Sequence, residues 1–446
     1  MRGEREELGG NINSDFMARL DFISSSQKYL DRVTKQYGKS ILHRLIRGMR
    51  RTITGTYKVR VEGIFAVEKT PDAFLTLQHN LIDGNIDGFE WPSWLECKEM
   101  TTSDLLLKHK TELKNMRGKI DLIAGGPPCQ GFSFAGRRNP SDPRNKLTEE
   151  YIELVNLIRP KYLLLENVKG FKTAFKGTNE PAYSHVVEQT LKDLKWGGYV
   201  VFSSMLNASM FGVPQPRARF IMIAVRSDIA LNELTSPFEK IDIYAQSFRD
   251  DRQLNGHQIT VKEAISDLEV GRKKVIESED TKGFMQIRYR EPKNMTSYQA
   301  LMRDGMESEH APNSLRMARH RPETIKRFKE ILVSCPKGKS LSKNDRVRFN
   351  MKKQCFTPLH PDQISRAITT LPDDLLHYKE PRILTVRENA RLQSFPDWFE
   401  FRGKYTTGGA RRKEECPRYT QVGNAVPPLM AEALGSRIAQ FSDSVN

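Results

Sequence analysis

The chain has 446 residues, 38% hydrophobic and 28% charged, a composition typical of a globular protein with a sizeable core. Lysine and arginine exceed aspartate and glutamate by 16, and this excess favours a polyanionic partner, most often nucleic acid. Five cysteines without a CxxC pair exclude a disulfide scaffold, give no support to a structural zinc site and indicate reduced thiols, as in the cytosol. The charged residues 1–16 are no signal peptide, and no run of about 18 apolar residues predicts a membrane span.

The first half of the chain predicts a sheet built from alternating strands and helices. Residues 1–57 form a divergent basic N-terminal segment, in which the spacing over 20–51 predicts one or two amphipathic helices. Residues 58–226 then alternate between apolar runs and helix-period segments. The predicted strands are 59–68, 119–126, 161–168, 199–206 and 219–226, and the predicted helices are 71–81, 148–158 and 185–194. This order predicts an α/β fold with a doubly wound sheet.

The second half of the chain has a different composition and hydrophobic pattern. Residues 227–365 are polar, charged and irregular, and they predict a second, smaller domain that carries many basic side chains. Regular patterns return in residues 366–446, where 381–401 and 419–441 contain helix-period segments that we expect to pack back against the sheet. The chain contains no internal repeat or low-complexity tract.

Polar side chains stand at the ends of three predicted strands. Glu68 ends the strand 59–68, Cys129 follows the strand 119–126, and Glu166 and Asn167 close the strand 161–168. Ligands of a doubly wound sheet bind beyond the carboxyl ends of its strands. These groups therefore predict a functional site along one edge of the sheet.

Cys129 stands between two prolines, which restrict the backbone, and a stretch whose composition predicts a flexible loop. Pro127 and Pro128 fix the backbone before it, and the following stretch is rich in glycine, serine and arginine. A thiolate is a strong nucleophile when nearby positive charge or dipoles lower its pKa. The pattern favours a nucleophilic cysteine over a buried structural one.

Five stretches of the chain resemble the fourth, sixth, eighth, ninth and tenth motifs of the DNA (cytosine-5) methyltransferases. They are, in order, GGPPCQGFS, LLLENVKG, PQPRARFIMIAV, LTVRENARLQSFP and QVGNAVPP. The resemblance extends from about residue 60 to 440, and the basic stretch 227–365 falls where that family keeps its target recognition domain. It implies a Rossmann-like, S-adenosylmethionine-dependent sheet with a smaller recognition domain, and a methyl transfer to C5 of a cytosine flipped out of DNA.

The resemblance also implies roles for individual residues. Cys129 would add to C6 of cytosine, Glu166 would protonate N3, and Asn167 would fix the exocyclic amine. Arg217 and Arg219 would hold the base carbonyl or the catalytic carboxylate. The segment from Gly131 to Asn145 would close over the base. The substrate would be contacted by Gln130, Ser133, Arg137 and Arg138.

The donor site implied by the resemblance is incomplete. Glu68 matches the acidic residue that holds the donor ribose, and Pro127 and Asn424 would border the donor, but the expected glycine loop is missing from residues 40–55. The first, central strand of the sheet is accordingly expected to be absent or replaced. The adenine contact is left open between Glu99 and Asp104.

Two functions remain open at this point. The first is a methyltransferase that modifies double-stranded DNA in the bacterial cytosol, without a metal and as a monomer, paired with a restriction endonuclease for the same site. The second is a relative without a donor loop that retains only DNA binding. A third possibility, transfer RNA methylation, fits the long basic insert less well.

Overall fold

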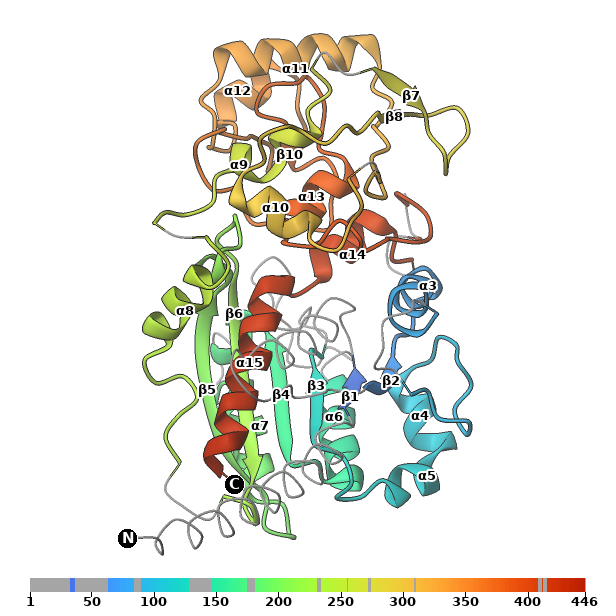
Figure 1. Ribbon diagram of the computed structural model, residues 1–446, viewed down its shortest axis with the longest axis vertical. Helices are drawn as coiled ribbons and strands as arrows, with labels where there is room; N and C mark the ends of the chain where they lie inside the picture. Colours follow the sequence, from blue (N-terminus) through green and yellow to red (C-terminus); the bar gives the residue numbers. More distant parts are fainter. Residues whose placement is uncertain are drawn as a thin grey trace, which may run out of the picture.

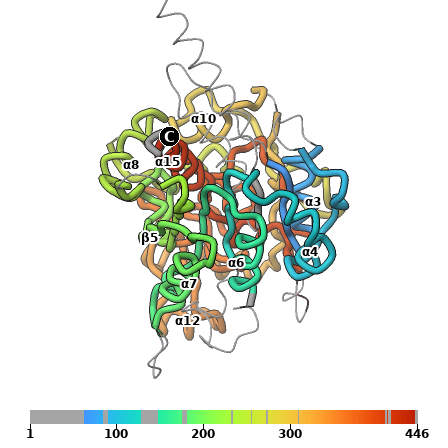
Figure 2. Tube along the Cα trace, turned by 90° about the horizontal axis from the view of Figure 1, so that it is seen from below, coloured from blue at the N-terminus to red at the C-terminus, as the bar shows by residue number. Residues whose placement is uncertain are grey.

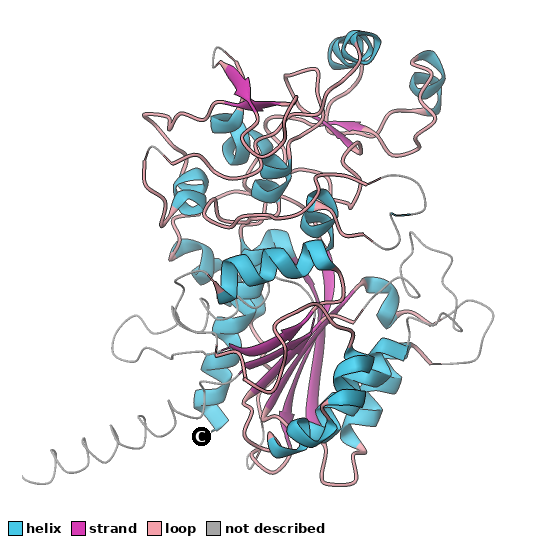
Figure 3. Ribbon diagram, turned by 90° about the vertical axis from the view of Figure 1, so that its right-hand side faces the viewer, coloured by secondary structure: helices cyan, strands magenta, loops and turns pink. Residues whose placement is uncertain are grey.

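The computed structural model describes residues 33–36, 63–83, 90–127, 146–174, 181–230, 234–254, 256–271, 274–308, 310–407, 411 and 415–445. These residues form two lobes, with a sheet in the lower lobe and mainly short helices and long loops in the upper one (Figures 1 and 3). In the described part of the chain, none of the helices has the length and apolar character needed to cross a bilayer.

The sheet has six strands in the order β2-β1-β3-β4-β6-β5. Strands β2, β1, β3 and β4 run parallel, β6 is antiparallel to β4, and β5 is antiparallel to β6. Their bounds are Val33–Gln36 (β1), Gly63–Val67 (β2), Leu122–Gly125 (β3), Tyr162–Asn167 (β4), Tyr199–Asn207 (β5) and Ala218–Arg226 (β6). The five strands predicted between residues 59 and 226 are confirmed, and the α/β class with them.

Strand β1 corrects the reading of the N-terminal segment. Residues Val33–Gln36 lie inside the stretch 20–51 predicted to be helical, yet they form the first strand of the chain, which was expected to be absent or replaced and which lies between β2 and β3. Val33 and Thr34 are β-branched, and the backbone pairs with β2 on one side and β3 on the other. Two hydrogen-bonded neighbours outweigh a local helical spacing. The sheet therefore starts within residues 1–57.

The alternation of side chains along the strands builds two apolar cores, one on each face. On the first face, Leu122, Leu164 and Ile223 pack beneath helices from both ends of the chain, and on the second face Ile123 and Leu163 pack beneath another set. Figure 2 shows α15 and α8 on one side of the sheet and α6 and α7 on the other. The first set is α3 (Pro71–Leu77), continued by η1 (Gln78–Ile82), α8 (Ile241–Asp250) and α15 (Pro428–Val445); the second is α4 (Thr102–Lys108), α5 (Lys110–Asn115), α6 (Lys146–Ile158) and α7 (Tyr183–Lys192).

Helix α15 attaches the C-terminal part of the chain to the sheet. Phe441 lies edge-on to Phe202 of β5 at 5.9 Å, and the Tyr244 hydroxyl donates to the Ala433 carbonyl. Glu432, with a side chain 1% exposed, pairs with Arg252 after α8. The last helix thus closes the first face of the sheet.

The upper lobe consists of residues from about 256 to 424, and its own core includes Phe328, Ile331, Phe356 and Leu376. Buried ion pairs join its helices, since Arg391 contacts both Asp267 and Asp397 with all three side chains fully buried. Its elements are α9 (Val261–Ile265), β7 (Val275–Glu277), β8 (Met285–Ile287), α10 (Ser297–Arg303), α11 (Pro322–Ser334), α12 (Lys343–Arg348), β9 (Thr357–Pro358), β10 (Leu375–Leu376), α13 (Val386–Leu392) and α14 (Arg418–Asn424).

Candidate active site

The carboxyl ends of the parallel strands form one edge of the sheet, as the sequence predicted. Glu68 follows β2, Gly126 and Pro127 follow β3, and Glu166 and Asn167 end β4. Since β6 runs the other way, its first residues meet the same edge, where Asn167 pairs with Phe220. The sheet topology thus brings Arg219 to the last residues of β4.

Glu166 and Arg219 form a close ion pair at this edge. The distance from Arg219 Nε to Glu166 Oε1 is 2.6 Å, and the side chains are 15% and 16% exposed. Gly126 permits the arrangement, because a β-carbon there would lie 3.0 Å from Glu166 Oε2. The backbone after β3 therefore packs directly against the carboxylate.

Burial raises the pKa of Glu166 above the ordinary range of a glutamate. The positive charges of Arg219 and Arg217 act in the opposite direction, but burial has the larger effect. A carboxyl group that keeps its proton closer to neutral pH is suited to donate it, and the adjacent guanidinium fixes its orientation.

Asn167 connects the ends of two neighbouring strands. Its side chain is 1% exposed; Nδ2 donates to the Pro127 carbonyl at 3.3 Å, and Oδ1 accepts from the Val168 N–H at 2.9 Å. The Asn167 amide thereby fixes the backbone at Pro127, two residues before Cys129 in the sequence.

Arg217 and Arg219 have different surroundings. The Arg217 guanidinium is buried and donates to the carbonyls of Ile368 and Gly423, at 2.8 and 2.6 Å. Arg219 alone of the two makes the ion pair with Glu166. The structure thus brings Glu166, Asn167 and Arg219 together at the edge and turns Arg217 toward the C-terminal segments.

The acidic groups of the expected donor side lie at the end of β2. Glu68 Oε1 accepts from the backbone N–H and the hydroxyl of Thr70, and the Glu68 carbonyl accepts from Met100 N–H at 3.0 Å. This bond places Glu99 beside Glu68. Glu99 is exposed. Asp104 lies in the first turn of α4, where its carboxylate accepts from the Thr101 hydroxyl and pairs with Lys108 in the last turn.

Asn424 ends helix α14 and is exposed, next to a glycine that the packing requires. A β-carbon on Gly423 would lie 2.2 Å from the Thr369 carbonyl oxygen. No other residue allows the helix to cross the backbone at 369–370 so closely.

Several predicted residues lie outside the described part of the chain: Cys129, Gln130, Ser133, Arg137 and Arg138, together with the window 40–55. Strand β1 ends at Gln36, upstream of that window.

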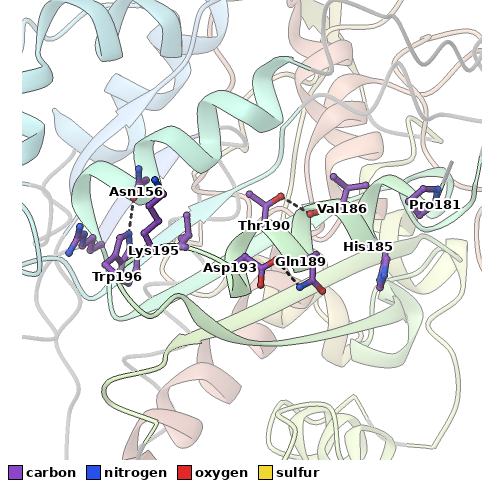
Figure 4. Close-up of a pocket in the computed structure, with 11 residues that line it drawn as sticks. Asn156, Pro181, His185, Val186, Gln189, Thr190, Asp193, Lys195 and Trp196 are labelled. Atoms are coloured by element: carbon purple, nitrogen blue, oxygen red, sulfur yellow. Dashed lines mark hydrogen bonds between the residues drawn. The ribbon is translucent and has the colours of Figure 1, made fainter.

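A groove on the outer side of α7 lies away from this edge (Figure 4). It ends at Trp196, whose indole N–H donates to Asn156 and whose ring carries the Arg159 guanidinium at 4.7 Å. Trp196 precedes the start of β5, which pairs with the end of β6 beside the first residue of β4. The groove therefore lies at the opposite end of the strands from Glu166. The groove is lined by Asn156, Arg159, Pro181, His185, Val186, Gln189, Thr190, Asp193, Leu194, Lys195 and Trp196.

Two buried glutamines near the site were not singled out from the sequence. Gln215 and Gln393 are fully buried and hydrogen-bonded to each other, and Gln215 also accepts from Ile368 N–H at 2.9 Å. Both stand inside quoted motifs, in PQPRAR and RLQSFP. Their place inside motifs that resemble those of the cytosine-5 methyltransferases was the available signal.

A parallel sheet with an antiparallel pair at one side and polar groups at its carboxyl edge is the architecture of the Rossmann-like, S-adenosylmethionine-dependent methyltransferases. The family model of the C-5 cytosine-specific DNA methylases matches residues 45–440. The chain belongs to this family, and its class as a DNA cytosine-5 methyltransferase related to restriction–modification systems follows.

Named relatives agree with this assignment. The chain is 32% identical over 366 residues to the type II methyltransferase M.DdeI of Desulfomicrobium norvegicum, covering 77% of this chain and 79% of the relative. It is 30% identical over 353 residues to the type II methyltransferase M1.HphI of Haemophilus parahaemolyticus, covering 77% and 74%. A crystal structure from E. coli, described as a DNA modification methyltransferase encoded within a prophage, shares the fold with a TM-score of 0.61 at 21% identity, over 92% of this chain and 99% of that one.

Proposed function

We propose that the protein transfers a methyl group from S-adenosylmethionine to C5 of a cytosine flipped out of double-stranded DNA. The observation that carries the proposal is the Glu166–Arg219 ion pair, at 2.6 Å and mostly shielded from solvent, at the carboxyl ends of the strands in a chain of the cytosine-5 family. A flipped base is required because C5 and C6 are inaccessible inside a stacked duplex.

The reaction follows from the chemistry of the residues. The Cys129 thiolate adds to C6 while the proton of Glu166 goes to N3, which makes C5 nucleophilic enough to take the methyl group. S-adenosylhomocysteine leaves as the methyl group is transferred. A base then removes the C5 proton, the thiolate leaves from C6, and the N3 proton returns to the Glu166 carboxylate. Arg219 orients the Glu166 carboxyl throughout and offsets negative charge that develops on the ring.

The described residues fit a donor carrying hydroxyl groups and an amine. Glu68 and Glu99 present two carboxylates at the end of β2, and Asn424 is exposed at the end of α14. We propose Glu68 for the ribose hydroxyls and Glu99, rather than the engaged Asp104, for the adenine amine. The donor supplies the methyl group on a sulfonium sulfur.

The wider assignments of the chain are also part of the proposal. Residues 58–226, with β1, form the catalytic domain, and helix α8 packs with it on the first face of the sheet. The rest of residues 227–365 reads the DNA, and residues 366–446 pass through the upper lobe and return to the catalytic domain in α15. The buried bonds from Arg217 to Ile368 and Gly423 support this return. We propose a monomer in the bacterial cytosol that shares its target site with a restriction endonuclease, as the type II relatives suggest.

Two measurements test the function. Duplex DNA with 5-fluorocytosine at the target, found first by methylation sequencing, should form a covalent adduct in the presence of donor, because the C5 proton can no longer be removed. Calorimetry should show micromolar binding of S-adenosylmethionine. A chain that binds DNA but neither binds the donor nor forms the adduct would be a DNA-binding relative without catalysis.

A further inference from the structure

The residues just before β6 are joined by buried hydrogen bonds to three segments far along the chain. Arg217 donates to the carbonyls of Ile368 and Gly423. Gln215 donates to the Leu392 carbonyl at 2.8 Å and accepts from Ile368 N–H. Four separate segments, at 215–217, 368, 392–393 and 423, therefore meet at one polar junction.

The partner of Gln215 extends this junction along α14. Gln393 Nε2 donates to the carbonyls of Val422 and Ala425, at 3.1 and 2.7 Å. With the bond from Arg217 to Gly423, the last turn of α14 has three carbonyls held by buried side chains. The Val422 carbonyl also accepts from Ala425 N–H at 3.3 Å, and the side-chain bonds to Gly423 and Ala425 add to this cap. The buried side chains therefore fix where the helix ends and where Asn424 stands.

Arg217 itself has little freedom to move. Its backbone N–H donates to Asn207 Oδ1 at 3.0 Å, and its carbonyl accepts from Ala208 N–H at 3.0 Å. Arg217 is thus fixed to the end of β5 and stands two residues before Arg219, the partner of Glu166. Any shift of α14 is transmitted to the same short segment that orients the acid.

We propose that Arg217 is a positioning residue that couples the Glu166–Arg219 pair to the end of α14. It thereby fixes the position of the residues that face the base, Glu166 and Arg219, relative to Asn424, which faces the donor. The inference rests on the proposed function for the meaning of the two sides, but the coupling itself is a property of the chain. Arg217 acts through Gly423 and Arg219.

The test compares three variants of the full chain. Arg217→Met removes the guanidinium, and Arg217→Lys keeps the charge but not the two-pronged geometry. Arg252→Met is the matched control, because it also removes a buried arginine, here the partner of Glu432 in α15. Hydrogen exchange of residues 365–370 and 418–427 is measured first, without donor or DNA.

We expect Arg217→Met to speed exchange in both segments by about tenfold or more, the equivalent of one hydrogen bond to a charged group. Arg252→Met should leave both segments unchanged and affect only α8 and α15. Donor affinity should fall about tenfold in Arg217→Met and less in Arg217→Lys, since the ammonium can hold one of the carbonyls. The alkaline limb of the pH profile of methyl transfer should shift to higher pH in Arg217→Met alone among the three variants, because this variant loses a positive charge that lowers the pKa of Glu166.

Equal exchange in wild type and Arg217→Met would overturn the inference, as would equal changes in Arg217→Met and Arg252→Met. A wild-type chain that binds no donor would refute the proposed function instead, and the exchange comparison would still decide the coupling. Equal losses of donor affinity in Arg217→Lys and Arg217→Met would also count against the positioning role. The retained ammonium would then contribute nothing, as expected if both variants simply misfold.

Discussion

Replacing Arg219 by methionine tests the central pair of the site. The variant keeps the length and apolar stem of the side chain and removes the guanidinium that lies 2.6 Å from Glu166. Both side chains are about five-sixths buried, so water screens the pair weakly. A hydrogen bond between charged groups contributes about 1.5–3 kcal/mol, which corresponds to roughly a 10- to 150-fold loss of methyl-transfer rate.

The variant should also change the pH profile in a definite direction. Burial raises the pKa of Glu166 and Arg219 lowers it, so without Arg219 the pKa rises further. The carboxyl then keeps its proton to higher pH, and the alkaline limb of the profile moves upward although the maximal rate falls. Arg219→Lys should lose rate while the limb stays close to its wild-type position.

The assay is single-turnover transfer of labelled methyl groups to target DNA at saturating donor, measured across the alkaline range. Saturation removes any contribution from donor binding. A profile of Arg219→Met that keeps both the wild-type limb and more than a third of the wild-type rate would refute the role of the pair.

Three further variants test other parts of the structure. Cys129→Ser should abolish methyl transfer and leave DNA binding intact by gel shift; normal transfer would exclude Cys129 as the nucleophile. Gly423→Ala should cost about 1–3 kcal/mol in urea unfolding, because the clash with the Thr369 carbonyl exceeds the gain in helix propensity. Arg391→Leu should cost about 3–5 kcal/mol by leaving two buried carboxylates unpaired, and Asp397→Asn in the same chain should recover part of this loss.

The strands and helices between residues 59 and 226 were predictable because their signals are local. Apolar runs such as LLLEN and FIMIAV are strands buried on both faces, and Glu68 and Glu166 could be assigned to one edge from the parallel order alone. Strand β1 could not be predicted. Its residues, VTKQ, have no apolar run, and they become a strand only because β2 and β3 offer hydrogen bonds on both sides.

By itself, the sequence determined the fold class, the edge on which the site lies and the family, since each follows from residues close together in the chain. The tertiary structure alone decided which arginine meets the acid. Arg217 and Arg219 stand two positions apart in one motif, yet one donates to Ile368 and Gly423 and the other pairs with Glu166. Those partners are brought in from distant segments, and local spacing holds no information about where distant backbone carbonyls come to lie.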